Sequence, residues 1–289
     1  MNDYMVRAVD RQGRFRVVAA VTTNTAEEAR KRHDTWPIAS AALGRALTAG
    51  LLLGSNLKGD DLLTLRIQGD GPLRGILVSA NGAGEVRGYV LEPHVDLPSE
   101  PSGKLPVGAG VGKGLLHVTR DLGLKEPFTG CVELVSGEIG EDTAQYLLVS
   151  EQTPSAVSLG VLVGVDAKVR ASGGLMLQLF PGAEEELLSH LEQNVSSLPP
   201  ISSLIDSGLS PEEIVLKAVN GLPLLFLEQN PVSFNCRCTK ERTKDILASL
   251  GAQDLTALIK EQGFAEVRCH FCGEKYLFSP ADLSDICNL

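Results

Sequence analysis

Two short cysteine motifs near the C-terminal end decide how this chain is read: Phe234-Asn235-Cys236-Arg237-Cys238 and Val267-Arg268-Cys269-His270-Phe271-Cys272-Gly273. They form a C-x-C and a C-x-x-C about 30 residues apart. Four thiolates in two local pairs suit a tetrahedral zinc site, because each pair occupies one turn and the fold brings the pairs together. Gly273 permits the tight turn that lets backbone amides face the sulfurs. The predicted ligands are Cys236, Cys238, Cys269 and Cys272.

Other interpretations of these cysteines are weaker but stay open. Four thiolates suit zinc or iron, and one zinc is the commoner outcome in a reducing cytoplasm. The four cysteines could instead be reduced thiols of a hydrophobic core, but such cysteines would rarely cluster in pairs. His270 could compete with them as a metal ligand. A thioredoxin-type motif belongs at a helix start after a strand. Here the flanking residues instead predict the two arms of a small hairpin: Phe264, Val267, Tyr276 and Phe278.

The segment 232–289 holds five of the six cysteines and four of the eight phenylalanines. A segment this short supports only a marginal core, so metal binding, about 10–16 kcal/mol in small zinc peptides, would supply most of its folding free energy. The thiolates are also oxidisable, and within each pair they are close enough in sequence to form a disulfide. Oxidation is therefore expected to eject the metal and unfold this module.

The overall composition is that of a globular protein with a real core. The 289 residues carry 26 basic and 36 acidic side chains, a net charge of −10, and 43% are hydrophobic. Such an acidic chain offers no cationic field for a phosphate backbone, so nucleic acid and anionic membranes are not expected partners.

Membrane insertion and export are not expected either. The best apolar runs, Ala46–Gly54 and Ser155–Val165, fall short of the roughly 18 residues that a bilayer span requires. The start of the chain lacks the basic and apolar regions of a secretory signal. Six cysteines are too few for a disulfide scaffold, so the pattern favours reduced thiols in a cytoplasm.

Alternating strand and helix signals in residues 1–180 indicate the α+β class. The runs Tyr4–Val9 and Phe15–Val21 predict a hairpin, Thr25–Glu28 has the form of a capping box, and Ile38–Leu53 has the composition of a buried helix. Later segments bounded by turn residues predict further strands: Leu62–Gln68, Leu73–Ser79, Val86–Leu91, Leu115–Arg120, Cys131–Val135 and Leu175–Leu179.

Residues 181–231 predict a helical linker of short helices. Leu187, Leu188 and Leu191 repeat at helical spacing, and Ser210-Pro211-Glu212-Glu213 is a capping box with proline at the first helical position. The chain is therefore expected to comprise an N-terminal core (1–180), a helical linker (181–231) and a zinc-binding module (232–289). The linker run Leu222–Leu227 is one candidate surface for binding other proteins if the module unfolds.

Several other features receive structural interpretations. The glycine-rich segment Gly108–Gly114 satisfies no phosphate-loop pattern and is expected to be a mobile loop. Gly137–Asp142 groups three carboxylates, which a solvated turn explains best. Cys131 is expected to be a buried inert thiol, and Cys287 an exposed one.

Further residues around the cysteines resemble the redox-regulated heat-shock chaperones of bacteria, the thirty-three-kilodalton heat-shock protein family. Cys236-x-Cys238 is followed by Lys240-Glu241-Arg242 and Leu250-Gly251, and Cys272-Gly273 by Tyr276-x-Phe278. The resemblance extends over nearly the whole chain. Its segments in the core are Pro127–Gly130, Glu133–Asp142, Ser150–Ser155 and Gly173–Gln178 with Pro181-Gly182.

The resemblance implies an ATP-independent holdase, not an enzyme, that is inactive when reduced and bound to one Zn2+ per chain. Oxidation would convert the ligands to the disulfides Cys236–Cys238 and Cys269–Cys272 and release the zinc. The module and linker would then unfold and capture unfolding client proteins during oxidative stress in the cytoplasm. The resemblance also allows for a homodimer in the active state.

Three rival classes have to be weighed against this expectation. A zinc-ribbon protein that binds nucleic acid would need a basic patch with aromatic residues, which a chain of net charge −10 lacks overall. A protein in which the zinc site is purely structural is another alternative. A metalloenzyme would need an open coordination position, whereas four cysteines close the shell.

Overall fold

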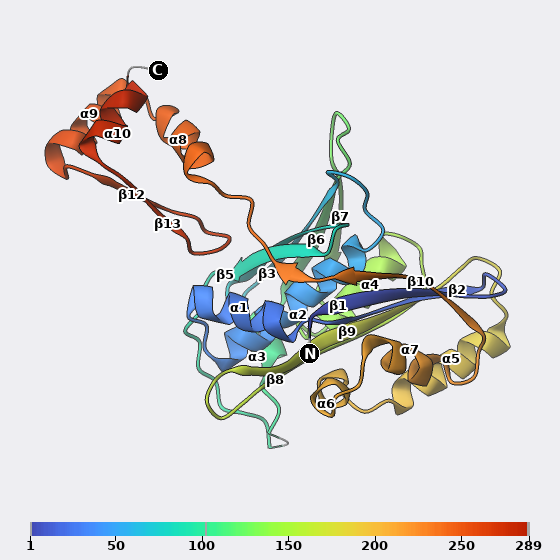
Figure 1. Cartoon of the computed structure of the whole chain (residues 1–289). Coiled ribbons are helices and arrows are strands. Elements are labelled where there is room, and N and C mark those ends of the chain that lie inside the picture. The colour runs from blue at the N-terminus through green and yellow to red at the C-terminus, as the bar shows by residue number, and fades with distance from the viewer. Residues whose placement is uncertain (1, 102, 288–289) are drawn as a thin grey trace. The chain divides into compact units, whose positions relative to one another are not determined.

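The structure is a computed structural model that describes residues 2–101 and 103–287 (Figure 1). The chain divides into two compact units, Met1–Asn235 and Cys236–Leu289, so the boundary falls directly before the first cysteine of the C-x-C motif. Residues 181–231 lie within the first unit, and the predicted division into core, linker and zinc-binding module stays a prediction. For Cys287 only the backbone is described, so the expectation of an exposed thiol lies outside the described side chains.

A five-stranded antiparallel sheet in the order β10-β1-β2-β9-β8 forms one layer of the first unit. The predicted N-terminal hairpin is confirmed. The prediction of a helical linker as far as residue 231 was wrong at its end: residues 224–231 form a strand, because β1 offers an open edge on which Leu225 pairs with Val9. The strands are β1 (Tyr4–Asp10), β2 (Phe15–Val21), β8 (Ser155–Val163), β9 (Val169–Leu179) and β10 (Leu224–Pro231).

A six-stranded sheet in the order β11-β5-β4-β3-β6-β7 forms the second layer. Its pairs are antiparallel except that β11 runs parallel to β5. The predicted strand at Cys131–Val135 begins and ends earlier than expected, at Phe128 and Glu133. The strands are β3 (Leu62–Gly69), β4 (Gly75–Asn81), β5 (Glu85–Val90), β6 (Gly114–Asp121), β7 (Phe128–Glu133) and β11 (Ser233–Phe234).

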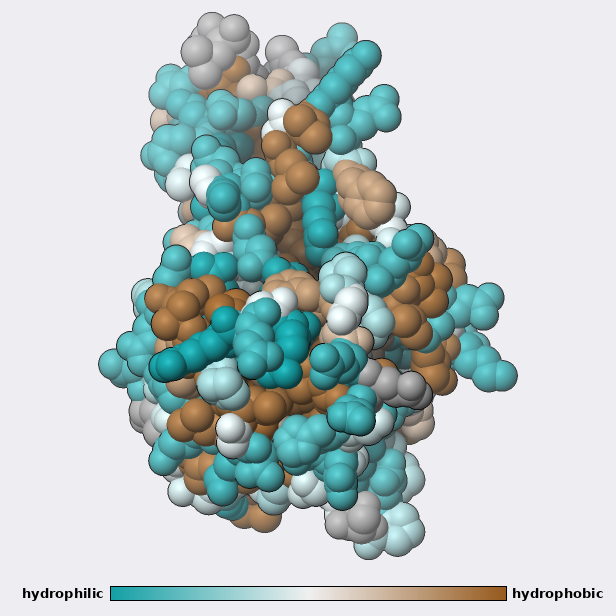
Figure 2. Space-filling view, turned by 90° about the vertical axis from the view of Figure 1, so that its right-hand side faces the viewer, coloured by the Kyte–Doolittle hydropathy of each residue, from teal (hydrophilic) through white to brown (hydrophobic). Residues whose placement is uncertain are grey.

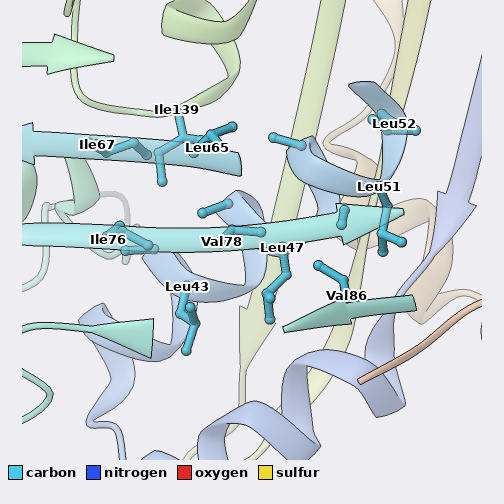
Figure 3. Close-up of a cluster of buried hydrophobic side chains, with 14 of the residues drawn as sticks. Leu43, Leu47, Leu51, Leu52, Leu65, Ile67, Ile76, Val78, Val86 and Ile139 are labelled. Carbon is cyan, nitrogen blue, oxygen red and sulfur yellow. The ribbon is translucent and has the colours of Figure 1, made fainter. Parts of the chain in front are cut away.

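Helix α2 (Pro37–Gly54) packs against strands of both sheets, and every residue from Ile38 to Gly54 is buried. A helix that is apolar all round must be enclosed, which confirms the predicted buried helix. Figure 3 shows its leucines facing side chains of β3, β4 and β5. By length and hydropathy α2 could cross a membrane, but 94% of it is buried inside the fold.

Helix α1 (Thr23–His33) begins two residues before the predicted capping box, with Thr22 at its N-cap. The reason is tertiary: the buried Asp3 carboxylate accepts hydrogen bonds from the backbone amides of Asn24 at 3.1 Å and Thr25 at 2.6 Å. A carboxylate from the residue directly before β1 thus satisfies the first amides of the helix.

Two expectations about loops were wrong. Gly108–Gly114 is not a mobile loop: its first four residues lie in helix α3 (Val107–Val111), and Gly114 begins β6. The backbone of α3 lies so close to Gly71 that a Cβ there would stand 2.5 Å from the Gly110 oxygen. Gly137–Asp142 is not a solvated turn, because Asp142 is fully buried at the start of helix α4 (Gly140–Val149). Its carboxylate accepts hydrogen bonds from the amides of Val135 and Ile139 at 2.7 and 2.8 Å, which holds the turn together.

Three helices cover the other face of the five-stranded sheet: α5 (Glu185–Ser197), α6 (Ile201–Asp206) and α7 (Pro211–Val219). The predicted capping box at Ser210 is confirmed: Ser210 Oγ accepts from the Glu213 amide at 3.2 Å, and the Glu213 carboxylate accepts from the Ser210 amide at 2.8 Å. The buried side chains of this layer are Leu187, Leu191, Ile201, Leu204, Ile205, Ile214, Val215, Ala218 and Val219.

The second unit is a β-hairpin with three helices. Its described core contains six buried apolar side chains: Leu247, Leu255, Ala265, Phe278, Leu283 and Ile286. The elements are α8 (Lys240–Ala248), α9 (Ala252–Glu261), β12 (Ala265–Arg268), β13 (Lys275–Phe278) and α10 (Pro280–Cys287). The observed α+β architecture with a small C-terminal cysteine module confirms the predicted class.

Candidate metal centre

The C-x-C motif lies in the extended segment that leads into α8. The Thr239 side chain caps this helix by accepting a hydrogen bond from the Arg242 amide at 3.2 Å. Arg242 also donates from Nη1 to the Arg237 carbonyl at 2.9 Å, which ties the residue between the two cysteines to the helix. These two hydrogen bonds fix the backbone of the C-x-C segment against the start of α8.

The C-x-x-C motif occupies the turn of the β12–β13 hairpin, as predicted from the flanking apolar residues. Val267 pairs with Tyr276 across the hairpin, the Cys269 amide donates to the Glu274 carbonyl at 2.9 Å, and the Gly273 amide donates to the Cys269 carbonyl at 2.8 Å. Gly273 has φ 72°, a conformation that costs glycine little. The prediction that Gly273 makes the turn is confirmed.

The four sulfur atoms converge. All lie within 4.8 Å of one another, with Cys236 Sγ 3.8 Å from Cys269 Sγ and Cys238 Sγ 3.3 Å from Cys272 Sγ. A tetrahedral zinc with Zn–S bonds of about 2.3 Å would place its sulfurs about 3.8 Å apart. The spacing and the donor set therefore fit a zinc ion. His270 is not part of this cluster among the described residues.

Burial raises the pKa values of the Cys269 and Cys272 thiols. The backbone amides of Cys272 and Phe271 point at the Cys269 sulfur and act in the opposite direction, since a thiolate accepts such hydrogen bonds. Without a metal the two thiols keep their protons, so a metal that binds here has to displace them. Metal affinity at this site is thereby linked to pH.

Tyr276 is a neighbour of the cluster that the sequence indicated only as part of a hairpin arm. Its hydroxyl lies 3.1 Å from the Cys238 carbonyl and 3.2 Å from Cys238 Sγ. The hydrogen bond to Cys238, with burial second, raises the pKa of Tyr276, so the hydroxyl remains a donor to the sulfur. A donor of this kind stabilises a thiolate ligand and fixes its orientation.

The donor set also decides what kind of metal site this is. Four sulfurs fill a tetrahedral shell, which is typical of structural zinc sites, and leave no position for a substrate. The sulfurs remain oxidisable, so the arrangement suits a site that binds a metal and can lose it on oxidation.

Cys131, the one described cysteine outside the two motifs, contradicts the sequence-based expectation. Cys131 is exposed, not buried, because β7 is an edge strand and Cys131 points to its open face. The predicted strand at Cys131–Val135 was shifted along the chain, and the sequence carried no signal of which face is covered.

The chain is similar to known proteins over almost its whole length. The profile of the family described as Hsp33 protein matches residues 3–279. The 33 kDa chaperonin of Desulforamulus reducens is 60% identical over 286 residues, which cover 99% of this chain and 97% of that protein. The 33 kDa chaperonin of Geobacillus kaustophilus is 49% identical over 287 residues, with coverage of 99% and 98%.

A solved structure agrees with these sequence comparisons. The crystal structure of the 33 kDa chaperonin, an Hsp33 homolog from Thermotoga maritima, superimposes with a TM-score of 0.92 at 36% identity and covers 99% of this chain and 98% of that chain. The match includes the unit that carries the four converging cysteines, so this chain belongs to the Hsp33 family of chaperones.

Proposed function

We propose that this protein is an ATP-independent holdase that oxidation activates and reduction silences. The observation that carries the proposal is the cluster of four sulfurs within 4.8 Å in a unit whose described core has only six buried apolar side chains. A unit with so small a core depends on its metal, and thiolate ligands make that metal removable by oxidants. The role requires no enzymatic chemistry.

In the reduced state one Zn2+ binds Cys236, Cys238, Cys269 and Cys272. The short sulfur contacts join Cys236 to Cys269 and Cys238 to Cys272, so the metal links the C-x-C segment to the hairpin. Oxidation forms Cys236–Cys238 and Cys269–Cys272, the pairs that the family resemblance implies. These disulfides are local, so once the zinc has left no cross-link joins the two motifs, and the unit loses its main constraint.

Client proteins then bind apolar surface on the linker and the unfolded module. The packing of helix α5 supports this proposal. A cavity of about 480 Å³, lined largely by apolar side chains, lies between α5, α4 and the end of β9. Incomplete packing of this kind lowers the free energy needed to release a helix. Figure 2 shows that apolar residues, in brown, already reach the surface in patches.

The decisive experiment measures light scattering by a heat-unfolded test protein. Oxidised, zinc-free protein should suppress aggregation with or without ATP, and the reduced, zinc-bound form should not. Reduction with zinc returned should restore the inactive state. Equal suppression by both forms would contradict regulation by oxidation and leave a structural zinc protein as the remaining alternative.

Single serine variants identify the ligands. Cys236→Ser, Cys238→Ser, Cys269→Ser and Cys272→Ser should each lose zinc. Cys131→Ser is the matched control and should retain both zinc and switching. Full zinc content in any of the first four variants would remove that residue from the shell.

Reduced thiols at the metal centre require a reducing compartment, so we place the protein in the cytoplasm. Its partners are unfolding proteins, not nucleic acid or membranes, in line with the net charge of −10. Sedimentation of both redox forms tests for a homodimer in the active state.

A further inference from the structure

Three side chains form a row across the outer face of the six-stranded sheet. Arg66 on β3 pairs with His117 on β6, and His117 pairs with Cys131 on β7. Residues directly opposite each other in an antiparallel sheet present their side chains on the same face. Cys131 Sγ lies 4.0 Å from His117 Nε2, so the nucleophile and a base are in contact.

The row is open to solvent and carries unbalanced positive charge. Cys131 and Arg66 are exposed, His117 is half-buried, and β7 is the edge strand, so a small molecule can approach Cys131 from above and from the side. Arg66 has no ion-pair partner among the residues that the structure describes. On this face Glu133 lies two positions along β7 from Cys131, opposite Leu115.

We propose that Cys131 is a thiol–disulfide exchange site that takes up a low-molecular-weight thiol bearing carboxylate groups, such as a glutathione-type peptide, as a mixed disulfide. Reactive cysteines typically occupy exposed positions beside basic groups. His117 contacts the reacting sulfur, and Arg66 supplies the charge that attracts the carboxylates of the incoming disulfide. The modification site is separate from the four cysteines of the metal centre.

The exchange step balances without an outside oxidant other than the small disulfide itself. In the tautomer with its proton on Nδ1, His117 takes the Cys131 thiol proton at Nε2. The Cys131 sulfur then attacks one sulfur of the small disulfide: the new protein–small-thiol bond forms, the bond between the two small thiols breaks, and the leaving thiolate departs with that electron pair. The leaving thiolate accepts the proton from His117.

The test exposes reduced, zinc-loaded protein to three small disulfides in turn: oxidised glutathione, which is anionic, bis(2-hydroxyethyl) disulfide, which is neutral, and cystamine, which is cationic. Intact mass and peptide mapping give the rate of adduct formation at each cysteine. One adduct at Cys131 is expected while zinc stays bound, with rates in the order anionic, neutral, cationic. Cys131→Ser should form no adduct under these conditions.

Variants separate the roles of the neighbours. Arg66→Gln should slow the anionic reagent about twofold to fivefold, the range of an exposed charge interaction, and abolish the rate order, whereas Arg66→Lys should keep it. His117→Gln should slow all three reagents alike. Salt should weaken the preference for the anionic reagent.

Equal rates for the three reagents, a Cys131 rate no higher than that of an unstructured peptide of the same local sequence, or first reaction at the zinc cysteines would overturn the proposal. The outcome is independent of chaperone regulation, since Cys131→Ser should switch normally in the aggregation assay.

Discussion

The two units of this protein reach stability by different physical means. The first encloses α2 between two sheets and packs a second apolar cluster beneath α5–α7, so its stability comes from burying apolar surface. The second has six buried apolar side chains in its described part and four sulfurs that converge on one point. The proposed function therefore predicts that oxidants dismantle the second unit, while the part of the first unit around α2 stays folded.

Removing zinc is the strongest way to test this contrast. Chelation under reducing conditions should unfold residues 236–289 and leave the first unit folded, because structural zinc contributes about 10–16 kcal/mol in small zinc peptides. Hydrogen exchange should lose protection from about residue 236 onward, weaken in α5–α7 and persist in α2. A metal-free second unit that stays protected would show that its apolar core suffices.

Matched truncations compare the two cores directly. Leu47→Ala in α2 and Phe278→Ala in β13 both remove a buried side chain, at a cost of about 2–5 kcal/mol each. Leu47→Ala should lower the denaturant midpoint of the first unit at unchanged zinc affinity. Phe278→Ala should instead weaken zinc binding, because folding and metal binding are linked in its unit. Leu216→Ala, at a half-exposed position on α7, is the control and should change neither quantity.

Helix caps offer a smaller and more local perturbation. Ser210→Ala removes the cap of α7 and Thr239→Ala that of α8, each at about 1 kcal/mol. The first should let the linker release at a lower oxidant concentration without changing zinc affinity. The second should speed zinc transfer to a chelator while the linker stays unchanged. Identical effects of the two variants would mean that linker and module unfold as one element.

Acidification should affect the two units differently. In the first unit the expected loss of stability is the smallest of the effects predicted here. The hydrogen bond from Arg14 lowers the pKa of Asp10. The stability that Asp10 contributes is therefore fully present above the ordinary carboxyl pKa and is lost as pH falls through the lowered one, with at most about 1 kcal/mol at stake. Asp10→Asn should flatten the acid limb of denaturant midpoints measured between neutral and acid pH.

The second unit should respond to acid earlier. Because the pKa values of Cys269 and Cys272 are raised, protons compete with the metal for these sulfurs. Zinc affinity should therefore decrease as the pH is lowered, at pH values well above those at which carboxylates take up protons. Zinc transfer to a dye at decreasing pH measures this. A zinc affinity that does not change with pH would contradict metal binding by displaced protons.

Several structural features were predictable because neighbours in the sequence produce them. The apolar composition of residues 38–53 required a buried helix, Ser210 and Glu213 satisfied each other three residues apart, and the residues flanking Cys269 and Cys272 alternated as hairpin arms. The errors concern groups whose partners are distant. Leu224–Pro231 is a strand because β1 lacks a partner on that edge, and Asp142 is buried because it receives amides from the turn before α4.

The sequence by itself determined the four-cysteine donor set and its placement in a segment too short for a large core, since ligand type and spacing are local properties of the chain. The dependence of this unit on a metal is the prediction that follows from them. Only the tertiary structure decided which faces are covered. It brought the sulfurs of two separate motifs within 4.8 Å, left Cys131 exposed on an edge strand, and aligned it with His117 and Arg66 from two other strands. The physical reason is that strand pairing depends on long-range register and on which sheet edges remain open, and neither is encoded in any short stretch of residues.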